Sequence, residues 1–140
     1  MSKNGFTLIE LIMVMVIIGI LAAVSIPRFT NVVRQSEAAS EQGVLINMVA
    51  ALDTYSHERF IEDGVLEWPD NPFDGLDTKP TGYTTDATDA DVDGEWTYNT
   101  TSLKITHQRN DNSRVGWAYA KGTQTGDAAN VGTLGARASL

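Results

Sequence analysis

A long apolar run near the N-terminus constrains this chain more than any other feature. Residues 6–26 are strongly apolar except for one threonine, one glycine, one serine and a single carboxylate, Glu10. As a helix, this segment would be about 30 Å long, which is enough to cross the hydrocarbon core of a bilayer. An acidic side chain at the centre of a bilayer costs about 2.5 kcal/mol or more, so Glu10 is expected to have a partner. The run therefore predicts a membrane-spanning helix with a functional carboxylate near its start.

The rest of the chain is acidic and contains no cysteine. Residues 28–140 hold 9 Lys and Arg against 17 Asp and Glu, and the whole chain of 140 residues has a formal net charge of −8. Nucleic-acid-binding surfaces need a basic footprint, so nucleic acid is not expected as a direct partner. Without cysteine, neither a disulfide nor a thiolate metal site can form. The length suits one domain of ordinary size.

Two interpretations of the apolar run follow from composition alone. In the first, the run is a permanent anchor, and Lys3 favours a cytoplasmic N-terminus, although Arg28 and Arg34 on the far side weaken this bias. In the second, it is a secretory signal peptide, because Ala23-Val24-Ser25 meets the rule for small residues at a cleavage site. The short leader with one lysine, and the carboxylate near the start of the apolar region, argue against the signal peptide.

The string Gly5-Phe6-Thr7-Leu8-Ile9-Glu10-Leu11 resembles the processing site of the type IV pilins and pseudopilins. In that family, a prepilin peptidase cuts after the glycine and methylates the new N-terminal residue. The resemblance implies a cleaved leader over residues 1–5, a scissile bond between Gly5 and Phe6, and an N-methylated phenylalanine at Phe6. It covers residues 3 to about 35.

The same resemblance gives three further residues a role in assembly. Glu10 would pair with the N-terminal amine of a neighbouring subunit. Gly19 and Pro27 lie where family members carry a helix-loosening glycine and a proline kink. The pairing is physically reasonable, because an α-amine with a pKa of about 8 is mostly charged at neutral pH and a buried carboxylate is tolerated when it is paired. The alternative for Glu10 is that it snorkels to the lipid headgroups.

Beyond the apolar run, the pattern predicts a long helix followed by a loop. Residues 28–62 repeat apolar side chains at spacings of three and four, with Glu41 among the polar complement, and predict an amphipathic continuation of the 6–27 helix. Asp63-Gly64 is expected to stop it. Residues 63–94 are interrupted by proline and glycine and predict a connecting loop, anchored to the domain by Trp68 and Phe73.

Residues 95–140 predict a small antiparallel sheet. Apolar and polar residues alternate from Glu95 onward, and the alternation breaks near residues 100–102 and again near 110–112. Such breaks indicate turns between about three short strands. The tail from Gly122 has weak patterning. A long N-terminal helix packed on a small antiparallel sheet, an α+β arrangement, is also the fold that the pilin resemblance implies.

One acidic loop is a candidate calcium site. Asp89, Asp91 and Asp93 alternate before Gly94, and an oxygen-lined loop of this spacing can wrap Ca²⁺. The loop departs from the EF-hand pattern, because position twelve is Thr100 and no helices flank it. Some pseudopilins of type II secretion bind calcium in a loop before their final strands. The alternative is a solvated acidic loop.

No catalytic pattern is found in the sequence. His57-Glu58 is not followed by a histidine at position 61, so the zinc-protease motif fails, and both His57 and His107 are expected on the surface. Asn99-Thr100-Thr101 is a formal glycosylation sequon. No nucleophile elbow or glycine-rich phosphate loop is present, and an enzyme is not predicted.

The resemblance implies a structural subunit of a helical filament made of many copies of the chain. The subunit would wait in the inner membrane as a single-pass protein with its N-terminus inside, until assembly machinery extrudes it. A type IV pilus subunit would build surface fibres for adhesion, motility or DNA uptake, whereas a type II secretion pseudopilin would build a short periplasmic filament.

Three observations bear on this choice and on a third possibility. Major pilins often close a C-terminal loop with a disulfide, which this chain cannot form. The missing cysteines and the candidate calcium loop both favour the pseudopilin. The tail and loop do not match the usual pseudopilin motifs, and the pilus subunit is the preferred interpretation. A membrane-anchored calcium-binding module that never polymerises would leave Glu10 unexplained.

Overall fold

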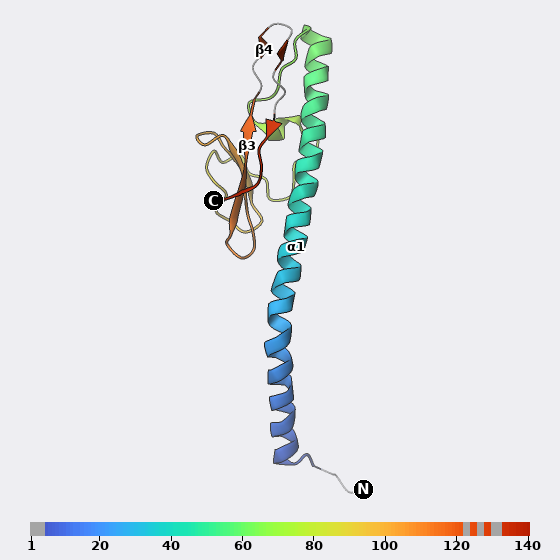
Figure 1. Cartoon of the computed structure of the whole chain (residues 1–140), viewed down its shortest axis with the longest axis vertical. Coiled ribbons are helices and arrows are strands. Elements are labelled where there is room, and N and C mark those ends of the chain that lie inside the picture. Colours follow the sequence, from blue (N-terminus) through green and yellow to red (C-terminus); the bar gives the residue numbers. More distant parts are fainter. Residues whose placement is uncertain (1–4, 122–123, 126–127, 130–132) are drawn as a thin grey trace. The chain divides into compact units, whose positions relative to one another are not determined.

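The computed structural model describes residues 5–121, 124–125, 128–129 and 133–140. It divides into two compact units, residues 1–40 and residues 41–140. A single helix, α1, runs from Leu8 to Asp63 and contributes to both units (Figure 1). The ranges predicted as a membrane helix and as its amphipathic continuation therefore belong to one element, and Pro27 does not end it.

The part of α1 in the N-terminal unit is strongly apolar over residues 8–26. Its most apolar stretch is long enough to span a membrane, and no part of that stretch is buried inside the structure. Large apolar side chains are at least 46 % exposed all along residues 8–33 and point in every direction around the axis. A helix that is apolar on all sides is stable only inside a membrane or within a bundle of other helices.

Helix α1 ends at the expected place for an identifiable reason. Gly64 has a φ of 72°, and its N–H donates to the Phe60 carbonyl at 2.9 Å, which is the left-handed termination that glycine favours. Arg59 adds a positive charge to the last turns and pairs with Asp63 at 2.8 Å.

The following loop contains one short 3₁₀ helix, η1, over Pro72–Gly75, capped by the Asn71 side chain, which accepts the Phe73 N–H at 3.0 Å. Trp68 and Phe73 are 3 % and 0 % exposed, so the prediction that they anchor this loop is confirmed.

The predicted three-stranded antiparallel meander is present and is extended by the tail. The three expected strands are β1 (Trp96–Asn99), β2 (Lys104–Gln108) and β3 (Arg114–Ala120). Two short strands, β6 (Thr133–Leu134) and β7 (Ala138–Ser139), both pair antiparallel with β3. The sheet order is β1-β2-β3-β6, with β7 beside the other end of β3.

A separate pair, β4 (Gln124–Thr125) and β5 (Ala128–Ala129), lies between β3 and β6 in the sequence. The weak patterning of the tail gave no signal for these strands, because each has only two residues.

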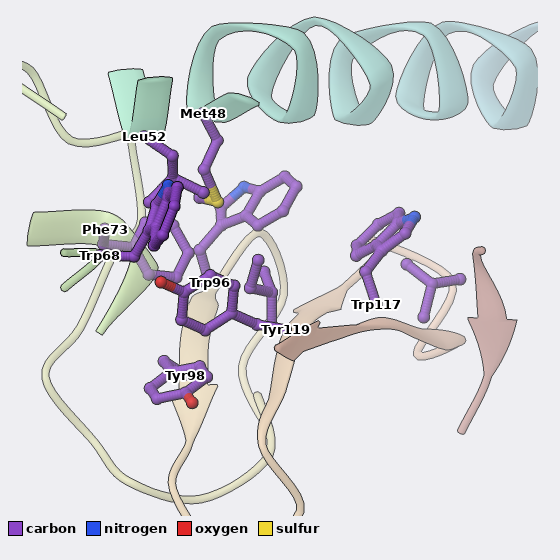
Figure 2. Close-up of a cluster of buried hydrophobic side chains, with 10 residues drawn as sticks. Met48, Leu52, Trp68, Phe73, Trp96, Tyr98, Trp117 and Tyr119 are labelled. Atoms are coloured by element: carbon purple, nitrogen blue, oxygen red, sulfur yellow. The ribbon is translucent and has the colours of Figure 1, made fainter. Parts of the chain in front are cut away.

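The core lies between α1 and one face of the sheet. Figure 2 shows Met48 and Leu52 extending from α1 into a cluster of aromatic rings. Trp96 stacks on Trp117 with ring centroids 5.9 Å apart, and Tyr98 meets Tyr119 edge-on at 6.0 Å. Alternation along the strands places these four rings on the same side, as the period-two pattern predicted. The core residues are Met48, Leu52, Trp68, Phe73, Trp96, Tyr98, Ile105, Val115, Trp117 and Tyr119.

The opposite face of β1 and β2 is covered by the loop that precedes them. Thr97 and Thr106 are both fully buried there and hydrogen-bond to each other at 2.7 Å. Thr97 also donates to the Thr88 carbonyl, and the Thr106 hydroxyl accepts the Ala90 N–H. The loop is therefore part of the packed domain, and two threonines supply the polar partners that its backbone needs.

Two expectations about polar residues are wrong. Glu41 is 2 % exposed, although it was expected on the polar face of the helix. His107 is 8 % exposed, and its ring stacks on Trp96 with centroids 4.3 Å apart while Nδ1 lies 2.8 Å from the Glu95 carbonyl oxygen. Both residues are buried because each finds a specific partner across the fold, which local sequence patterns do not report.

Candidate assembly and processing site

The predicted cleavage site lies just before α1, where residues 5–7 belong to no helix or strand. Gly5 and Phe6 precede the helix, which begins at Leu8, and the side chain of Phe6 is 85 % exposed. A Cβ built on Gly5 would meet no atom within 4 Å, so the backbone around the Gly5–Phe6 bond is open on that side. Cleavage by a protease needs accessible backbone outside regular structure, and residues 5–7 meet that requirement.

Glu10 forms a reciprocal cap with Thr7 at the start of the helix. The Glu10 Oε2 atom accepts the Thr7 backbone N–H at 2.8 Å and the Thr7 hydroxyl at 2.7 Å, and the Glu10 N–H donates to the Thr7 hydroxyl oxygen at 3.4 Å. This is the capping box, in which a threonine and a glutamate three residues later satisfy each other's free N–H groups. The spacing Thr-x-x-Glu is the signature of this motif, but the cap was not predicted from the sequence.

The cap fixes where the carboxylate of Glu10 lies. Its partner Thr7 is one residue beyond Phe6, so the negative charge is held next to the position that would become the N-terminus after cleavage. The negative charge also lies in the first turn of α1, where it interacts favourably with the helix dipole. The side chain is exposed, which leaves it accessible to a second molecule.

The other two predicted assembly residues lie within the same helix. Gly19 is exposed, and a Cβ built there would meet nothing within 4 Å, so it forms no close contact inside the subunit. The helix continues through Pro27. Exposed apolar side chains continue past the proline at Phe29, Val32 and Val33.

The acidic loop is organised around Glu95 rather than around the three predicted aspartates. Glu95 is 7 % exposed, and its carboxylate accepts the Asp91 N–H at 2.8 Å, the Thr84 hydroxyl at 2.8 Å and the Val92 N–H at 3.2 Å. Burial by itself raises the pKa of Glu95, but these hydrogen bonds to the charged form outweigh it and leave the pKa below its ordinary value.

The predicted calcium ligands have other partners. Asp89 accepts the Asn99 amide at 2.7 Å, and Asp93 accepts the Gln108 amide at 3.3 Å. Within the described ranges, no three Asp, Glu, His or Cys side chains lie in an arrangement that could hold a metal ion. The calcium site at Asp89, Asp91 and Asp93 stays a prediction from the sequence pattern.

A buried ion-pair cluster lies where the helix enters the folded unit. Arg109 donates from two of its guanidinium nitrogens, Nε and Nη2, to the Glu41 carboxylate, at 2.6 and 2.7 Å. Arg137 Nε and His107 Nε2 lie 3.8 and 3.9 Å from the same carboxylate. We name these four residues the Glu41 cluster. The periodicity of α1 offered one signal for it, because Glu41 lies on the same helix face as Leu45, Met48 and Leu52.

Comparison with known proteins identifies the N-terminal segment. Residues 1–26 match the prokaryotic N-terminal methylation motif. Among curated proteins, the type II secretion system core protein G of Pseudomonas aeruginosa is 35% identical over 81 residues, which are 58% of this chain and 54% of that protein. The core protein G of Vibrio cholerae is 37% identical over 83 residues, 57% of this chain and 52% of that protein.

Fimbrial proteins are also similar; a fimbrial protein of Dichelobacter nodosus is 40% identical over 75 residues, which are 53% of this chain and 44% of that protein. The type IV major fimbrial protein FimA of Dichelobacter nodosus is 42% identical over 52 residues, which are 37% of this chain and 33% of that protein. The chain thus spans about half the length, or less, of these curated relatives. No solved structure gives a significant match.

Proposed function

We propose that this chain is the structural subunit of a type IV pilus-like filament that assembles through its N-terminal helix; the methylation motif at residues 1–26 and the similarity to type IV pilins and pseudopilins support this. The observation that carries the proposal is the combination of three features in one segment. They are an open Gly5–Phe6 bond, a carboxylate held beside it by Thr7, and an unburied helix that is apolar on every side.

The first step would be processing in the membrane. A prepilin peptidase would cut the Gly5–Phe6 bond and methylate the new amine of Phe6. That amine would lie one residue from Thr7, whose N–H is bonded to Glu10. A methylated amine keeps its positive charge, so cleavage creates a cation that can pair with this carboxylate.

The second step would be extraction of the helix into a bundle of parallel copies. In such a bundle, the apolar side chains of α1 bury one another, and an unpaired Glu10 would be costly. The amine of a neighbouring Phe6 would neutralise it. We infer that this pairing sets the register between neighbours, because a shift along the axis would separate the two charges.

The role is structural, and no side chain of the site is assigned a catalytic task. Before assembly, the helix would hold the subunit in the inner membrane with residues 1–5 on the cytoplasmic side, and assembly machinery would supply the work of extrusion. The acidic C-terminal unit would then cover the outside of the filament.

A type II secretion pseudopilin is the second candidate. One specific observation favours it, which is that the matches to core protein G extend over 81 and 83 residues, whereas the matches to two fimbrial proteins of Dichelobacter nodosus cover 52 and 75. Electron microscopy of sheared surface material separates the two candidates. Long surface fibres containing the chain would support the pilus, and their absence together with a short periplasmic filament would support the pseudopilin.

The test of the filament role separates the charge of Glu10 from its capping function. Glu10→Gln keeps an oxygen that can accept the Thr7 N–H but removes the negative charge, whereas Thr7→Ala removes the hydroxyl and keeps the charge. We expect Glu10→Gln to insert and to be cleaved normally but to give little filament, and Thr7→Ala to assemble with a smaller loss. Filament yield at the wild-type level in Glu10→Gln would refute the pairing. Mass spectrometry of the mature chain should find N-methylated Phe6, and an intact leader in assembled material would contradict the whole proposal.

A further inference from the structure

Other segments of the chain cover both edge strands of the main sheet, β1 and β3. The segment beside β1 is tightly packed, whereas the segment beside β3 is largely exposed. At the β1 edge, the Trp96 N–H donates to the Gly82 carbonyl and the Thr84 N–H donates to the Trp96 carbonyl, both at 3.0 Å. Gly82 has a φ of 84°, and a Cβ there would lie 2.2 Å from the Gly94 carbonyl oxygen, so only glycine allows this approach. The β1 edge is therefore closed by tightly packed backbone.

The β3 edge is closed by residues 133–140, which we name the strap. Two short pairings join it to β3, with Leu134 opposite Tyr119 at one end and Ala138 opposite Gly116 at the other. The Gly135 N–H donates to the Ala118 carbonyl at 2.8 Å, and the Leu140 N–H donates to the Arg114 carbonyl at 3.1 Å. Strap residues 135–140 are all exposed.

These bonds show which groups of β3 the strap protects. The Tyr119 N–H donates to the Leu103 carbonyl on the other side, and successive residues of a strand point in opposite directions. The backbone groups of Arg114, Gly116 and Ala118 therefore face the strap. If the strap leaves, they form an open strand edge, which is a template for pairing with an extended segment of another molecule.

One ion pair links the strap to the interior of the domain. Arg137 lies between the two pairing sites, and its Nε atom is 3.8 Å from Glu41 Oε2. Glu41 is 2 % exposed and is fixed by two hydrogen bonds from Arg109, so it is a rigid acceptor. Two apolar side chains also anchor the strap: Leu134 packs against the core cluster, and Leu140 lies over Gly116, where an added Cβ would be 3.0 Å from Leu140 Cδ1.

We propose that residues 133–140 are a detachable strap that closes the strand-accepting edge of β3, and that the pairing of Arg137 with buried Glu41 is the latch that holds it. This ion pair restrains the strap in a chain that contains no cysteine and therefore no disulfide. Release of the strap does not require the helix, β1 or β2 to open, because none of their backbone hydrogen bonds is shared with it. This device is independent of the proposed filament role.

Hydrogen exchange of the full chain in detergent micelles, read by mass spectrometry on fragments, tests the proposal. Arg137→Gln removes the latch charge, and Arg114→Gln is the matched control, because Arg114 is on the same edge but its side chain pairs with Gln108. We expect Arg137→Gln to speed exchange about two- to fivefold in residues 133–140 and in 114–120, the range expected for a partly exposed ion pair. Exchange in residues 104–108 should not change, and Arg114→Gln should behave as wild type.

Two further variants distinguish the latch from general loss of stability. Arg137→Lys keeps the charge and should exchange at nearly the wild-type rate. Leu140→Ser removes the apolar contact and should also speed exchange in the strap and in β3 only. Equal exchange in Arg137→Gln and Arg114→Gln would overturn the latch. Acceleration of β1 and β2 to the same extent as the strap would overturn the idea that the strap opens by itself.

Discussion

The Glu41 cluster allows a quantitative prediction about the stability of the C-terminal unit. The side chain of Glu41 is 2 % exposed, that of Arg109 is 8 % exposed, and two hydrogen bonds of 2.6 and 2.7 Å join them. Removal of one partner of such a pair leaves an uncompensated buried charge, which costs about 3–5 kcal/mol. We therefore expect Glu41→Gln to lower the free energy of unfolding by that amount, since Gln cannot neutralise Arg109.

The size of the effect depends on which partner is removed. Arg109→Met leaves Glu41 with Arg137 and His107 at 3.8 and 3.9 Å, so it should cost less than Glu41→Gln. The double change Glu41→Met with Arg109→Met removes both charges and fills the space with apolar atoms. Its unfolding free energy should lie within about 1–2 kcal/mol of wild type, because replacement of a whole buried pair is often neutral.

Tryptophan fluorescence provides an assay that reports on this unit alone. The chain has three tryptophans, at positions 68, 96 and 117, and all are at most 4 % exposed within the C-terminal unit. Urea and thermal unfolding of the full chain in micelles can therefore be followed without a signal from the apolar helix. For a unit of about 100 residues, 1 kcal/mol shifts the melting temperature by about 4–8 °C, so Glu41→Gln should melt more than about 12 °C below wild type.

A matched control and two outcomes make the reasoning refutable. Arg59→Met removes a surface arginine, 36% exposed, that pairs with Asp63, and should cost at most about 1 kcal/mol. If Glu41→Gln cost no more than this control, the cluster would not be a buried ion pair in solution. If the double change to Met cost as much as Glu41→Met and Arg109→Met measured separately and added, the two charges would not be coupled.

Three other predictions concern pH and calcium. The pKa of Glu95 is lowered in the folded state, so its contribution to stability is present above the unfolded value of about 4.3 and is lost as the pH falls through the folded pKa. Between pH 6 and 2, the melting temperature should therefore fall less steeply for Glu95→Gln than for wild type. Burial raises the pKa of Tyr119 above its ordinary value, so the melting temperature of the chain should fall as the pH rises above about 10. Tyr119→Phe lacks the hydrogen bond to the Pro69 carbonyl, but its melting temperature should fall less over that pH range. If the predicted calcium site forms, millimolar Ca²⁺ should raise the melting temperature of wild type but not of Asp91→Asn, and no shift in wild type would exclude the site.

Local patterns predicted the secondary structure better than the polar contacts. The end of α1 at Asp63 was readable because glycine adopts a positive φ, and the turns between β1, β2 and β3 were readable because the strand alternation breaks there. The Glu41–Arg109 pair was not predicted, because 68 residues separate its members. The helical spacing places Glu41 on the buried face of α1, but it does not identify Arg109 as the partner. The strands β6 and β7 were also missed, since two-residue strands depend on the edge that they meet and not on their own propensity.

The capping box of Thr7 and Glu10 is a polar contact that has a local sequence signal but was not predicted. Its signature, Thr7 followed three residues later by Glu10, is local, but Glu10 already had an explanation in the family resemblance. The structure indicates that the two roles are compatible, because the cap engages Oε2 and leaves the side chain exposed. The carboxylate is thus positioned before any partner arrives.

Glu10 and Glu41 are two answers to the same physical problem, a carboxylate on a helix face that must become buried. Glu41 finds its cation within the subunit, so its charge is neutralised when the C-terminal unit folds. The hydrogen bonds of Glu10 to Thr7 satisfy N–H and O–H groups but bring no positive charge. A helix that is apolar on all sides can be buried only by a membrane or by other helices, and in both places an uncompensated carboxylate is costly. In the proposed filament, the cation for Glu10 would come from a group at the same level of the helix. A new amine at Phe6 of an adjacent copy meets that requirement, which is why cleavage is expected to precede assembly.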